Sequence, residues 1–224
     1  MEEIMTAKQK RDSVKKNYDL IAKQYSEEFG NYIEDLDVYE EFEKHLTPNA
    51  KILDLGAGSG RTYAYFNKRG FEYIGLDFSK EMRDSAYKLH GEFSYIVDDM
   101  VYIKNHFDNN SVDAVFAVYS LFHLPMQDLK QVLSGIYDIL NDNGVFLFTY
   151  QIGKGEEMAD EPYLNEKGKN VLYMSYQTNE EIANLLKEFS YTEIYRKEKV
   201  ETTENAINSN DVVTAFVLVK KKDK

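Results

Sequence analysis

The chain has 224 residues, of which 43% are hydrophobic, and its 39 Asp and Glu against 27 Lys and Arg give a formal net charge of −12. This length allows one α/β domain with a sizeable core, and the aromatic content is too high for a disordered protein. The absence of cysteine excludes disulfides, thiolate zinc sites and cysteine nucleophiles. The negative charge disfavours nucleic acid, because long-range repulsion opposes a polyanion.

No apolar run approaches the ~20 residues that a membrane-spanning helix needs. The N-terminal segment MEEIMTAKQKRDSVKK also lacks the apolar stretch of a signal peptide. We therefore expect a cytoplasmic protein without a membrane partner. The basic run Lys220 to Lys222 is predicted to be a solvated chain end rather than a nucleic-acid site.

The first 48 residues have a helical pattern. Tyr18, Ile21, Tyr25 and Phe29 recur at three- and four-residue steps, so they share one face of a helix. We expect residues 1–48 to form a helical cap that packs on the sheet edge or over a ligand cleft.

In the next hundred residues, short β-rich runs alternate with helical patterns at 61–68, 80–89 and 128–140 and with a shorter connection at 101–106. This alternation predicts parallel strands joined by right-handed crossovers, hence a doubly wound α/β sheet with helices on both faces. The expected strands are KILDL at 51–55, EYIGL at 72–76, FSYIV at 93–97, VDAVFAV at 112–118 and GVFLFTY at 144–150.

The C-terminal part changes pattern. After a helix expected at 179–189, two β-like runs at 191–201 and 212–222 flank the polar segment TTENAINSN at 202–210. This arrangement is typical of a hairpin, so one C-terminal strand should run antiparallel to the others. We see no linker or repeat. The chain is therefore predicted to be a single domain, organised as a cap (1–48), a ligand-binding half (49–150), an insertion or lid (151–178), and a final helix and hairpin (179–224).

A glycine loop follows the first expected strand. Gly56, Gly58 and Gly60 lie between that strand and a helical pattern, where glycine permits positive φ and close approach of the backbone to a ligand. A tight turn without a ligand is the alternative. Asp77, 21 residues beyond Gly56, ends the second expected strand and can accept hydrogen bonds from two ribose hydroxyls. The G-x-G-x-G spacing differs from the pyrophosphate-binding G-x-G-x-x-G and favours a ligand without phosphates over NAD or NADP.

These motifs together resemble the class I (seven-stranded, Rossmann-like) S-adenosylmethionine-dependent methyltransferases, especially their small-molecule branch. The resemblance implies a mostly parallel seven-stranded sheet with a C-terminal antiparallel hairpin, S-adenosyl-L-methionine as cofactor with S-adenosyl-L-homocysteine as product, and a small-molecule methyl acceptor. It is compatible with a monomer or a homodimer. The matching segments are ILDLGAGSGR at 52–61, GLDFSKEM at 75–82, IVDDM at 96–100, FDNNSVDAVFAVYSLFHLP at 107–125 and ILNDNGVFLFTY at 139–150.

The resemblance assigns roles along the cofactor. Gly56, Ala57 and Gly58 would line its methionine moiety, and Asp77 would hold its ribose hydroxyls. Asp54 would either fix the glycine loop or reach the ligand's amino group through water.

For the adenine, the resemblance implies apolar contacts from Phe78 and Met82. Asp99 would accept a hydrogen bond from the adenine amino group beside the Met100 backbone, with Asp98 as its adjacent competitor. Core packing is the alternative for the apolar pair, and capping of the next helix is the alternative for the acids.

The segment NYDLIAKQY resembles the Y-D-x-x-A-x-x-Y segment of this branch, in which Tyr18 and Tyr25 would cover the methionine end. Core packing gives the same spacing. The segment YSLFHLP, beginning at Tyr119, resembles the part of the family that faces the methyl group. His123 is its candidate general base or substrate contact, because a pKa near ~6.5 suits proton transfer at neutral pH, and a structural histidine is the alternative.

The insertion at 151–178 is the part that often contributes to the acceptor pocket in this family. Tyr163, Tyr173, Met174 and Tyr176 would supply apolar walls with hydroxyl groups, and a surface loop at the sheet edge is the alternative.

Methyl transfer from a sulfonium is a direct displacement on an already activated carbon, so alignment and water exclusion are the main tasks, and no catalytic residue is obligatory. No metal-ligand pattern is present, because the four histidines are isolated from one another. The alternatives are a non-catalytic S-adenosylmethionine-binding protein and an NAD(P)-dependent oxidoreductase.

Overall fold

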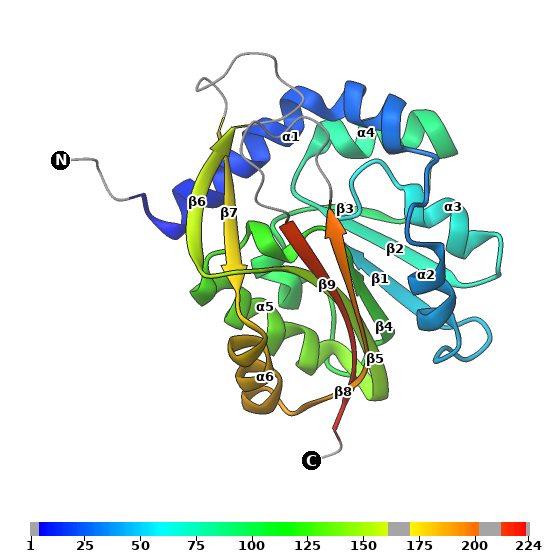
Figure 1. Cartoon of the computed structure of the whole chain (residues 1–224). Helices are drawn as coiled ribbons and strands as arrows, with labels where there is room; N and C mark the ends of the chain where they lie inside the picture. The colour runs from blue at the N-terminus through cyan, green and yellow to red at the C-terminus, as the bar shows by residue number, and fades with distance from the viewer. Residues whose placement is uncertain (1–4, 161–170, 202–211, 223–224) are drawn as a thin grey trace.

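The computed structural model of the chain describes residues 5–160, 171–201 and 212–222. Within these ranges the strands form one nine-stranded sheet, against which helices pack (Figure 1). The helices are α1 (Ala7–Phe29), α2 (Leu36–Glu43), α3 (Arg61–Asn67), α4 (Lys80–His90), α5 (Met126–Ile139) and α6 (Asn179–Glu188), with the short 3-10 helices η1 (Met100–Asn105) and η2 (Leu121–His123). The strands are β1 (Lys51–Leu55), β2 (Glu72–Asp77), β3 (Tyr95–Val97), β4 (Val112–Ala117), β5 (Leu140–Ile152), β6 (Gly155–Asp160), β7 (Val171–Gln177), β8 (Tyr191–Glu201) and β9 (Val212–Lys221).

The central strands lie in the order β3-β2-β1-β4-β5, and each neighbouring pair is parallel. The winding direction reverses between β1 and β4, which is where an open α/β sheet forms a crevice at its carboxyl edge. Beyond β5, β9 pairs antiparallel with β5, and β8 pairs antiparallel with β9. The sequence-based prediction of a mostly parallel seven-stranded sheet with a C-terminal antiparallel hairpin is therefore confirmed.

The two additional strands come from the insertion. β6 and β7 form an antiparallel pair, and the end of β7 pairs in parallel with the end of β5. The residues 172–175 of β7 are buried, so the alternative of a surface loop is wrong for this part of the insertion. Tyr163 and the polar turn predicted at 202–210 lie outside the described residues.

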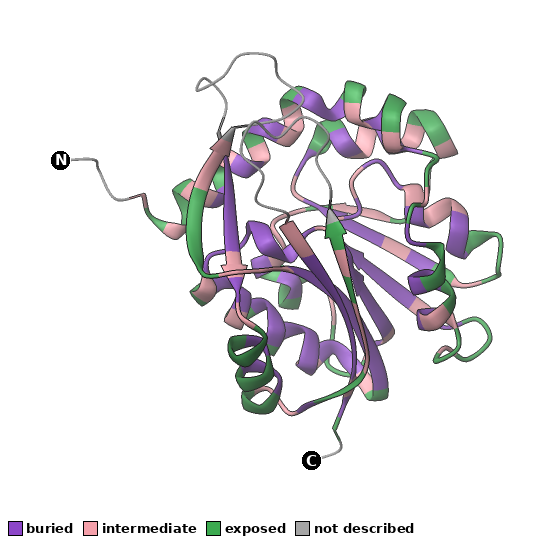
Figure 2. Cartoon of the chain, viewed as in Figure 1, coloured by how far each residue is buried: buried purple, intermediate pink, exposed green. Residues whose placement is uncertain are grey.

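The central strands β1 and β4 and residues 144–150 of β5 are buried on both faces, as expected for parallel strands covered by helices (Figure 2). The marginal strands β6 and β8 are mostly exposed or half-buried. Side chains alternate between the faces along each strand. In β5, Phe146 and Phe148 belong to one core cluster, and Val145 and Leu147 belong to the other. The sheet thus separates two hydrophobic layers.

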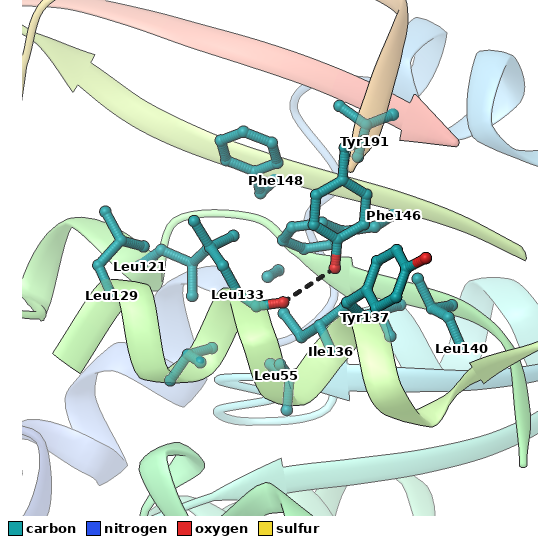
Figure 3. Packing of buried hydrophobic residues seen from close by; sticks show 14 of the residues in the cluster. Leu55, Leu121, Leu129, Leu133, Ile136, Tyr137, Leu140, Phe146, Phe148 and Tyr191 are labelled. Carbon is teal, nitrogen blue, oxygen red and sulfur yellow. Dashed lines mark hydrogen bonds between the residues drawn. The ribbon is translucent and has the colours of Figure 1, made fainter. Parts of the chain in front are cut away.

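The first layer lies between the sheet and α5 (Figure 3). Leu133 and Ile136 of α5 pack toward Phe146 of β5, and all three are 2% exposed or less. The Tyr191 hydroxyl donates a hydrogen bond of 3.0 Å to the Leu133 carbonyl, which satisfies a buried polar group at the start of β8.

The second layer is aromatic. Phe42 of α2 and Phe66 of α3 meet Phe116 of β4 edge to face, with ring centres 5.3 and 5.5 Å from Phe116. Because these rings fix α2 and α3 against β4, they also place the N-terminal residues of α3 beside the carboxyl edge of the sheet.

α1 lies across that edge beside α4 (Figure 1). Thr6 begins the helix with a capping box, in which its side chain accepts from the Gln9 backbone and the Gln9 side chain accepts from the Thr6 backbone. Ile21 packs against Met82 of α4, and Val14 packs near Tyr173 of β7. The predicted face of the N-terminal helix is therefore the face that contacts the rest of the molecule.

The basic run at the C-terminus differs from its prediction. Lys221 ends β9 and is 8% exposed, and its Nζ donates to the Asn110 side chain and to the Leu140 carbonyl. The prediction of a solvated end is wrong for this lysine, because the strand continues to residue 221 and its ammonium finds buried acceptors. No helix of the described residues combines the length and the apolar character that crossing a membrane requires.

Candidate active site

A cavity of about 870 Å³, including the open space at its mouth, lies at the carboxyl ends of β1, β2 and β4. This is the position expected for a ligand site in an open α/β sheet. The predicted site residues that line it are Tyr18, Tyr25, Asp54, Gly56, Ala57, Gly58, Asp77, Phe78, Met82, Asp99, Met100, Tyr119 and His123. The lining residues that sequence reasoning missed are Arg11, Tyr39, Ser59, Arg61, Thr62, Phe116, Val118, Ser120 and Leu124.

The glycine loop has the left-handed conformation that favours glycine, with φ of 80° at Gly56, 50° at Gly58 and 76° at Gly60. A Cβ on Gly56 would lie 2.4 Å from the Cβ of Ser120. A Cβ on Gly58 would meet nothing closer than an oxygen at 4.0 Å, so this glycine borders open space. Gly56 thus permits close packing of the loop against Ser120, and Gly58 leaves room in the cavity.

Asp54 is the penultimate residue of β1, just before this loop, and is buried. Its Oδ2 accepts hydrogen bonds from the Thr62 hydroxyl and, at 2.6 Å, from the Tyr73 hydroxyl. No described residue donates a hydrogen bond to its Oδ1. Burial raises the pKa of Asp54 to about 6, against the opposing effect of the two hydroxyl donors. The carboxylate therefore anchors the start of α3 through one oxygen only.

Asp77 joins the glycine loop to the end of β2. Its Oδ2 accepts from the Gly58 backbone N–H at 3.0 Å, and its Oδ1 accepts from the Ser79 backbone N–H at 2.8 Å. Burial raises the pKa of Asp77 to about 6, although these two N–H donors oppose the shift. Each carboxylate oxygen has a second lone pair, so both can still accept from a ligand.

The structure separates the two adjacent acids after β3. The Asp98 carboxylate lies 2.6 Å from Nε2 of His106 and is not part of the cavity lining. Asp99 does line the cavity, and its Oδ1 also caps η1 by accepting from the Val101 backbone at 3.2 Å. Of the two competitors, Asp99 is the one whose position suits a ligand contact.

Arg11 of α1 holds Asp99 from the other side. Its Nε donates to Asp99 Oδ2 at 2.6 Å, and its Nη1 pairs with Asp128 of α5. Arg11 is 7% exposed, so this is a buried ion network that ties α1 to η1 and α5. The sequence contained a signal for it, because position 11 continues the three- and four-residue spacing of Tyr18 and Tyr25 through Val14.

His123 lies in η2 with both ring nitrogens engaged. Nδ1 is 3.0 Å from the Tyr173 carbonyl, and Nε2 is 3.0 Å from the Tyr18 hydroxyl. Because a carbonyl only accepts, Nδ1 carries the proton and Nε2 accepts from Tyr18. Burial lowers the pKa of His123 to about 4, so the ring is neutral at neutral pH.

Tyr119 immediately follows Val118 beyond the end of β4 and has a φ of 60°, which is uncommon for a residue with a side chain. Its backbone N–H donates to Thr149 Oγ1 at 2.6 Å, and its hydroxyl donates to Asp35 Oδ2 at 2.7 Å. These two bonds hold the turn that places the ring against the cavity.

The insertion contributes to the site indirectly. Tyr173, Met174 and Tyr176 do not line this cavity in the described structure, and their contribution to an acceptor pocket stays a prediction. They pack instead with Val14 and Phe122 behind His123. The physical reason is that β7 forms part of the sheet, which turns these side chains into a small core.

Residues 53–148 match a family model described as "Methyltransferase domain". This segment of the chain is therefore similar to the methyltransferase family. The match lies within the segment over which the sequence motifs resemble this family, and the strand order agrees with it.

The chain also resembles curated proteins. The carboxy-S-adenosyl-L-methionine synthase of Pasteurella multocida is 24% identical over 179 residues, which cover 75% of this chain and 66% of that protein. The phosphoethanolamine N-methyltransferase of Plasmodium falciparum is 24% identical over 155 residues, covering 68% of this chain and 58% of that protein. The chain thus spans between 29% and 66% of the length of these and other curated relatives that it matches.

Among solved structures, the domain is similar to the 1,6-didemethyltoxoflavin-N1-methyltransferase of Burkholderia thailandensis, with a TM-score of 0.72 and 15% identity. The similarity covers 100% of this chain and 93% of that one, whose crystal structure contains S-adenosylhomocysteine and 1,6-didemethyltoxoflavin. At this identity the likeness shows the shared fold.

Proposed function

We propose that this protein is an S-adenosylmethionine-dependent methyltransferase that acts on a small-molecule acceptor by direct methyl displacement. The observation that carries the proposal is the position of Asp77. Its carboxylate is hydrogen-bonded to the Gly58 N–H inside the cavity, so the acid suited to ribose and the loop suited to methionine form one rigid unit.

Three residues of the lining show that the cavity could hold such a cofactor. Gly58 borders open space, and the Oγ atoms of Ser59 and Ser120 are buried in the lining without a described hydrogen-bond partner. Buried hydroxyls of this kind are normally satisfied, so a polar ligand is a natural partner for them. When bound, S-adenosylmethionine supplies a methyl group that is activated by the positive charge of its sulfonium.

The residues that would hold its adenosine part are grouped at one end of the cavity. Asp77 would accept from the ribose hydroxyls, and Asp99 would accept from the adenine amino group, with the Met100 backbone beside it. Phe78 and Met82 would pack against the adenine. Met82 is 1% exposed and contacts α1, so it belongs to the core and to the lining at once.

The residues at the reacting end of the cavity, where the methyl group would meet the acceptor, favour positioning over acid–base chemistry. His123 is neutral, and its Nε2 is occupied by the Tyr18 hydroxyl, so it is poorly placed to take a proton directly. Its bond instead fixes Tyr18 over the cavity. Together with Tyr119 and Leu124, these side chains would orient the acceptor and exclude water, which suits a displacement on an activated carbon.

A small acceptor is supported by the α1 residues that line the cavity and by the relatives. One curated relative is named for phosphoethanolamine, and one similar structure is named for didemethyltoxoflavin. The net charge of −12 disfavours nucleic acid as the acceptor. A cytoplasmic location, with the chain as a monomer or homodimer, is part of the same proposal.

Calorimetry with four ligands tests the proposal. S-adenosylmethionine and S-adenosylhomocysteine should bind and raise the melting temperature, whereas NAD and NADP should do neither. Binding of a nicotinamide cofactor alone would overturn the proposal. Formation of S-adenosylhomocysteine should then depend on a low-molecular-mass fraction of a cell extract. Tight binding without turnover on any fraction would instead favour the non-catalytic S-adenosylmethionine-binding protein.

A further inference from the structure

The polar side chains at the reacting end of the cavity donate their hydrogen atoms to other protein groups. The Tyr18 hydroxyl donates to Nε2 of His123 at 3.0 Å, and the Nδ1–H of His123 donates to the Tyr173 carbonyl at 3.0 Å. The Tyr119 hydroxyl donates to Oδ2 of Asp35 at 2.7 Å. The direction of each bond follows from its acceptor, because a carbonyl and a carboxylate only accept. These bonds decide what the wall can offer to a methyl acceptor.

Tyr18 presents an oxygen atom to the cavity, while its hydrogen atom is directed to His123. A phenol hydroxyl can accept as well as donate, so this oxygen can take a hydrogen bond from a ligand whatever other groups contact it. Tyr18 and Tyr119 lie at the same end, since both pack against the small core that contains Phe122. Leu124 adds apolar surface to the lining. The wall is therefore complementary to a molecule that donates a hydrogen bond from its reacting atom.

No described side chain at this end is placed to take a proton from the acceptor. Of the three carboxylates that line the cavity in the described structure, Asp54 and Asp77 lie beside the glycine loop. The third, Asp99, is held by the ion pair with Arg11. Burial lowers the pKa of His123 to about 4, so its ring is a weak base at neutral pH. An alcohol or a thiol has to lose its proton when it attacks a methyl group, and this wall gives such a nucleophile no help.

An amine satisfies both conditions, whereas a carboxylate, which only accepts hydrogen bonds, does not match the wall. The amine nitrogen attacks through its lone pair, and an N–H group remains to donate to the protein. The nitrogen–carbon bond forms as the carbon–sulfur bond breaks, and the electron pair of the broken bond stays on sulfur. The positive charge thus passes from sulfur to nitrogen. The product ammonium loses its proton to water afterwards, so the transfer itself needs no protein base.

We propose that the methyl acceptor is an amine and that Oη of Tyr18 accepts a hydrogen bond from the N–H of the acceptor nitrogen. This inference rests on the proposed function, because it names the class of acceptor for the same cavity. One N–H held by Tyr18 restricts the orientation of the nitrogen, which is the positioning that a direct displacement needs. The bond to His123 fixes the Tyr18 oxygen for this role.

The first test identifies the atom that receives the methyl group. S-adenosylmethionine with a carbon-13 methyl group is incubated with wild type and the low-molecular-mass fraction of a cell extract. The carbon-13 chemical shift of the methyl group in the product distinguishes bonds to nitrogen, oxygen, sulfur and carbon. We expect a methyl group bonded to nitrogen. This measurement uses wild type alone, so it does not depend on the folding of any variant.

The second test uses Tyr18→Phe, which removes the accepting oxygen and keeps the ring. The amount of the fraction that gives the half-maximal rate should rise about 3- to 10-fold, the scale of one hydrogen bond between neutral groups. The affinity for S-adenosylmethionine, measured by calorimetry, should stay within about twofold of wild type. Tyr32→Phe is the matched control, because Tyr32 is 55% exposed and does not line the cavity, and it should change neither quantity.

The possible failures are distinguishable. A labelled methyl group on oxygen, sulfur or carbon would overturn the amine and leave the proposed function standing. An unchanged half-maximal amount in Tyr18→Phe would overturn the contact with Tyr18. A loss of S-adenosylmethionine affinity as large as the change in the half-maximal amount would assign the Tyr18 oxygen to the cofactor instead. If wild type forms no labelled product with any fraction, the proposed function itself fails.

Discussion

The Tyr18 hydroxyl of α1 and Nε2 of His123 in η2 lie 3.0 Å apart, and this hydrogen bond joins the N-terminal helix to the segment after β4. The rings also meet edge to face, with centres 5.5 Å apart. The bond uses the histidine nitrogen that a general base would need. The chemistry of the reacting end can therefore be tested through this pair.

Tyr18→Phe and His123→Ala should each lower turnover about 10- to 100-fold without abolishing it, because each misplaces the cap without removing an obligatory proton acceptor. The double variant should lose little more than either single variant, since both remove one contact. Single-turnover formation of S-adenosylhomocysteine is the measurement. Tyr32→Phe, at an exposed tyrosine, is the control. A loss of more than about four decades in His123→Ala, with disappearance of a titration in the histidine range, would show an essential base.

The affinity for S-adenosylmethionine should fall as the pH is lowered through about 6. Burial raises the pKa values of Asp54 and Asp77 to about 6, and a ligand that donates hydrogen bonds binds their ionised forms. The affinity therefore reaches its full value above this pH, where both carboxylates are ionised. Below this pH the ligand must compete with protons for the carboxylates. Calorimetry between pH 5 and pH 8 measures the slope, and Asp77→Asn should reduce it. A flat profile in wild type would place the ligand away from both acids.

The same two acids affect the stability of the ligand-free fold in the opposite sense. Their pKa values are higher in the folded state than the usual 3.8, so the fold favours the protonated forms. Their contribution to the free energy of unfolding is present at low pH and is lost as the pH rises through about 6. The increase in melting temperature caused by S-adenosylhomocysteine should consequently be larger at pH 7.5 than at pH 5.

The two neighbouring acids after β3 should respond differently to the same substitution. Asp99→Asn should weaken cofactor binding by about 1.5 to 3 kcal/mol, the scale for a hydrogen bond to a charged group, and Asp77→Ala should have a similar effect. Asp98→Asn should leave the affinity within error of wild type, because Asp98 faces His106 outside the cavity. Equal losses at both neighbours would mean that the ligand reaches beyond the lining described here.

Hydrogen exchange across residues 17–29 should slow when cofactor is added, because α1 covers the cavity and contacts its lining. Arg11→Met should accelerate exchange in α1. It should also cost about 3 to 5 kcal/mol of stability, because it leaves Asp99 and Asp128 without their cation. Identical exchange of wild type with and without cofactor would restrict Tyr18 and Tyr25 to a packing role.

Glycine substitutions separate backbone strain from loss of cavity space. Gly58→Ala and Gly70→Ala both place a side chain at positive φ, and neither Cβ meets an atom closer than 4.0 Å. Each should cost about 1 kcal/mol of stability, but only Gly58→Ala should impair cofactor binding, because Gly58 lines the cavity. Gly56→Val should abolish activity, since even its Cβ would lie 2.4 Å from that of Ser120. Full activity in Gly56→Val would contradict the close packing of the loop.

The amino-acid sequence alone determined the sheet and the loop at its edge. Strand and helix periodicities are local properties of the chain, so the five parallel strands and the two C-terminal strands were predicted. β5 begins at Leu140, four residues before its predicted start, and β6 and β7 were not predicted as strands. The spacing of the glycines is a local signal too, because it follows from the backbone conformation of one turn. The acid at position 77 is also local, because its distance from the glycines follows from the length of one βα unit.

Only the tertiary structure decided which remote side chains meet. Arg11 and Arg61 are one residue type in similar helical contexts, yet the first is bonded to two acids and the second faces phenol rings. The sequence cannot distinguish Asp98 from Asp99, because the backbone conformation after β3 decides which of the two adjacent carboxylates points into the cavity. The partners of His123 come from α1 and β7, which are distant in the chain, and the burial that they produce moves its pKa away from the range that made it a candidate base.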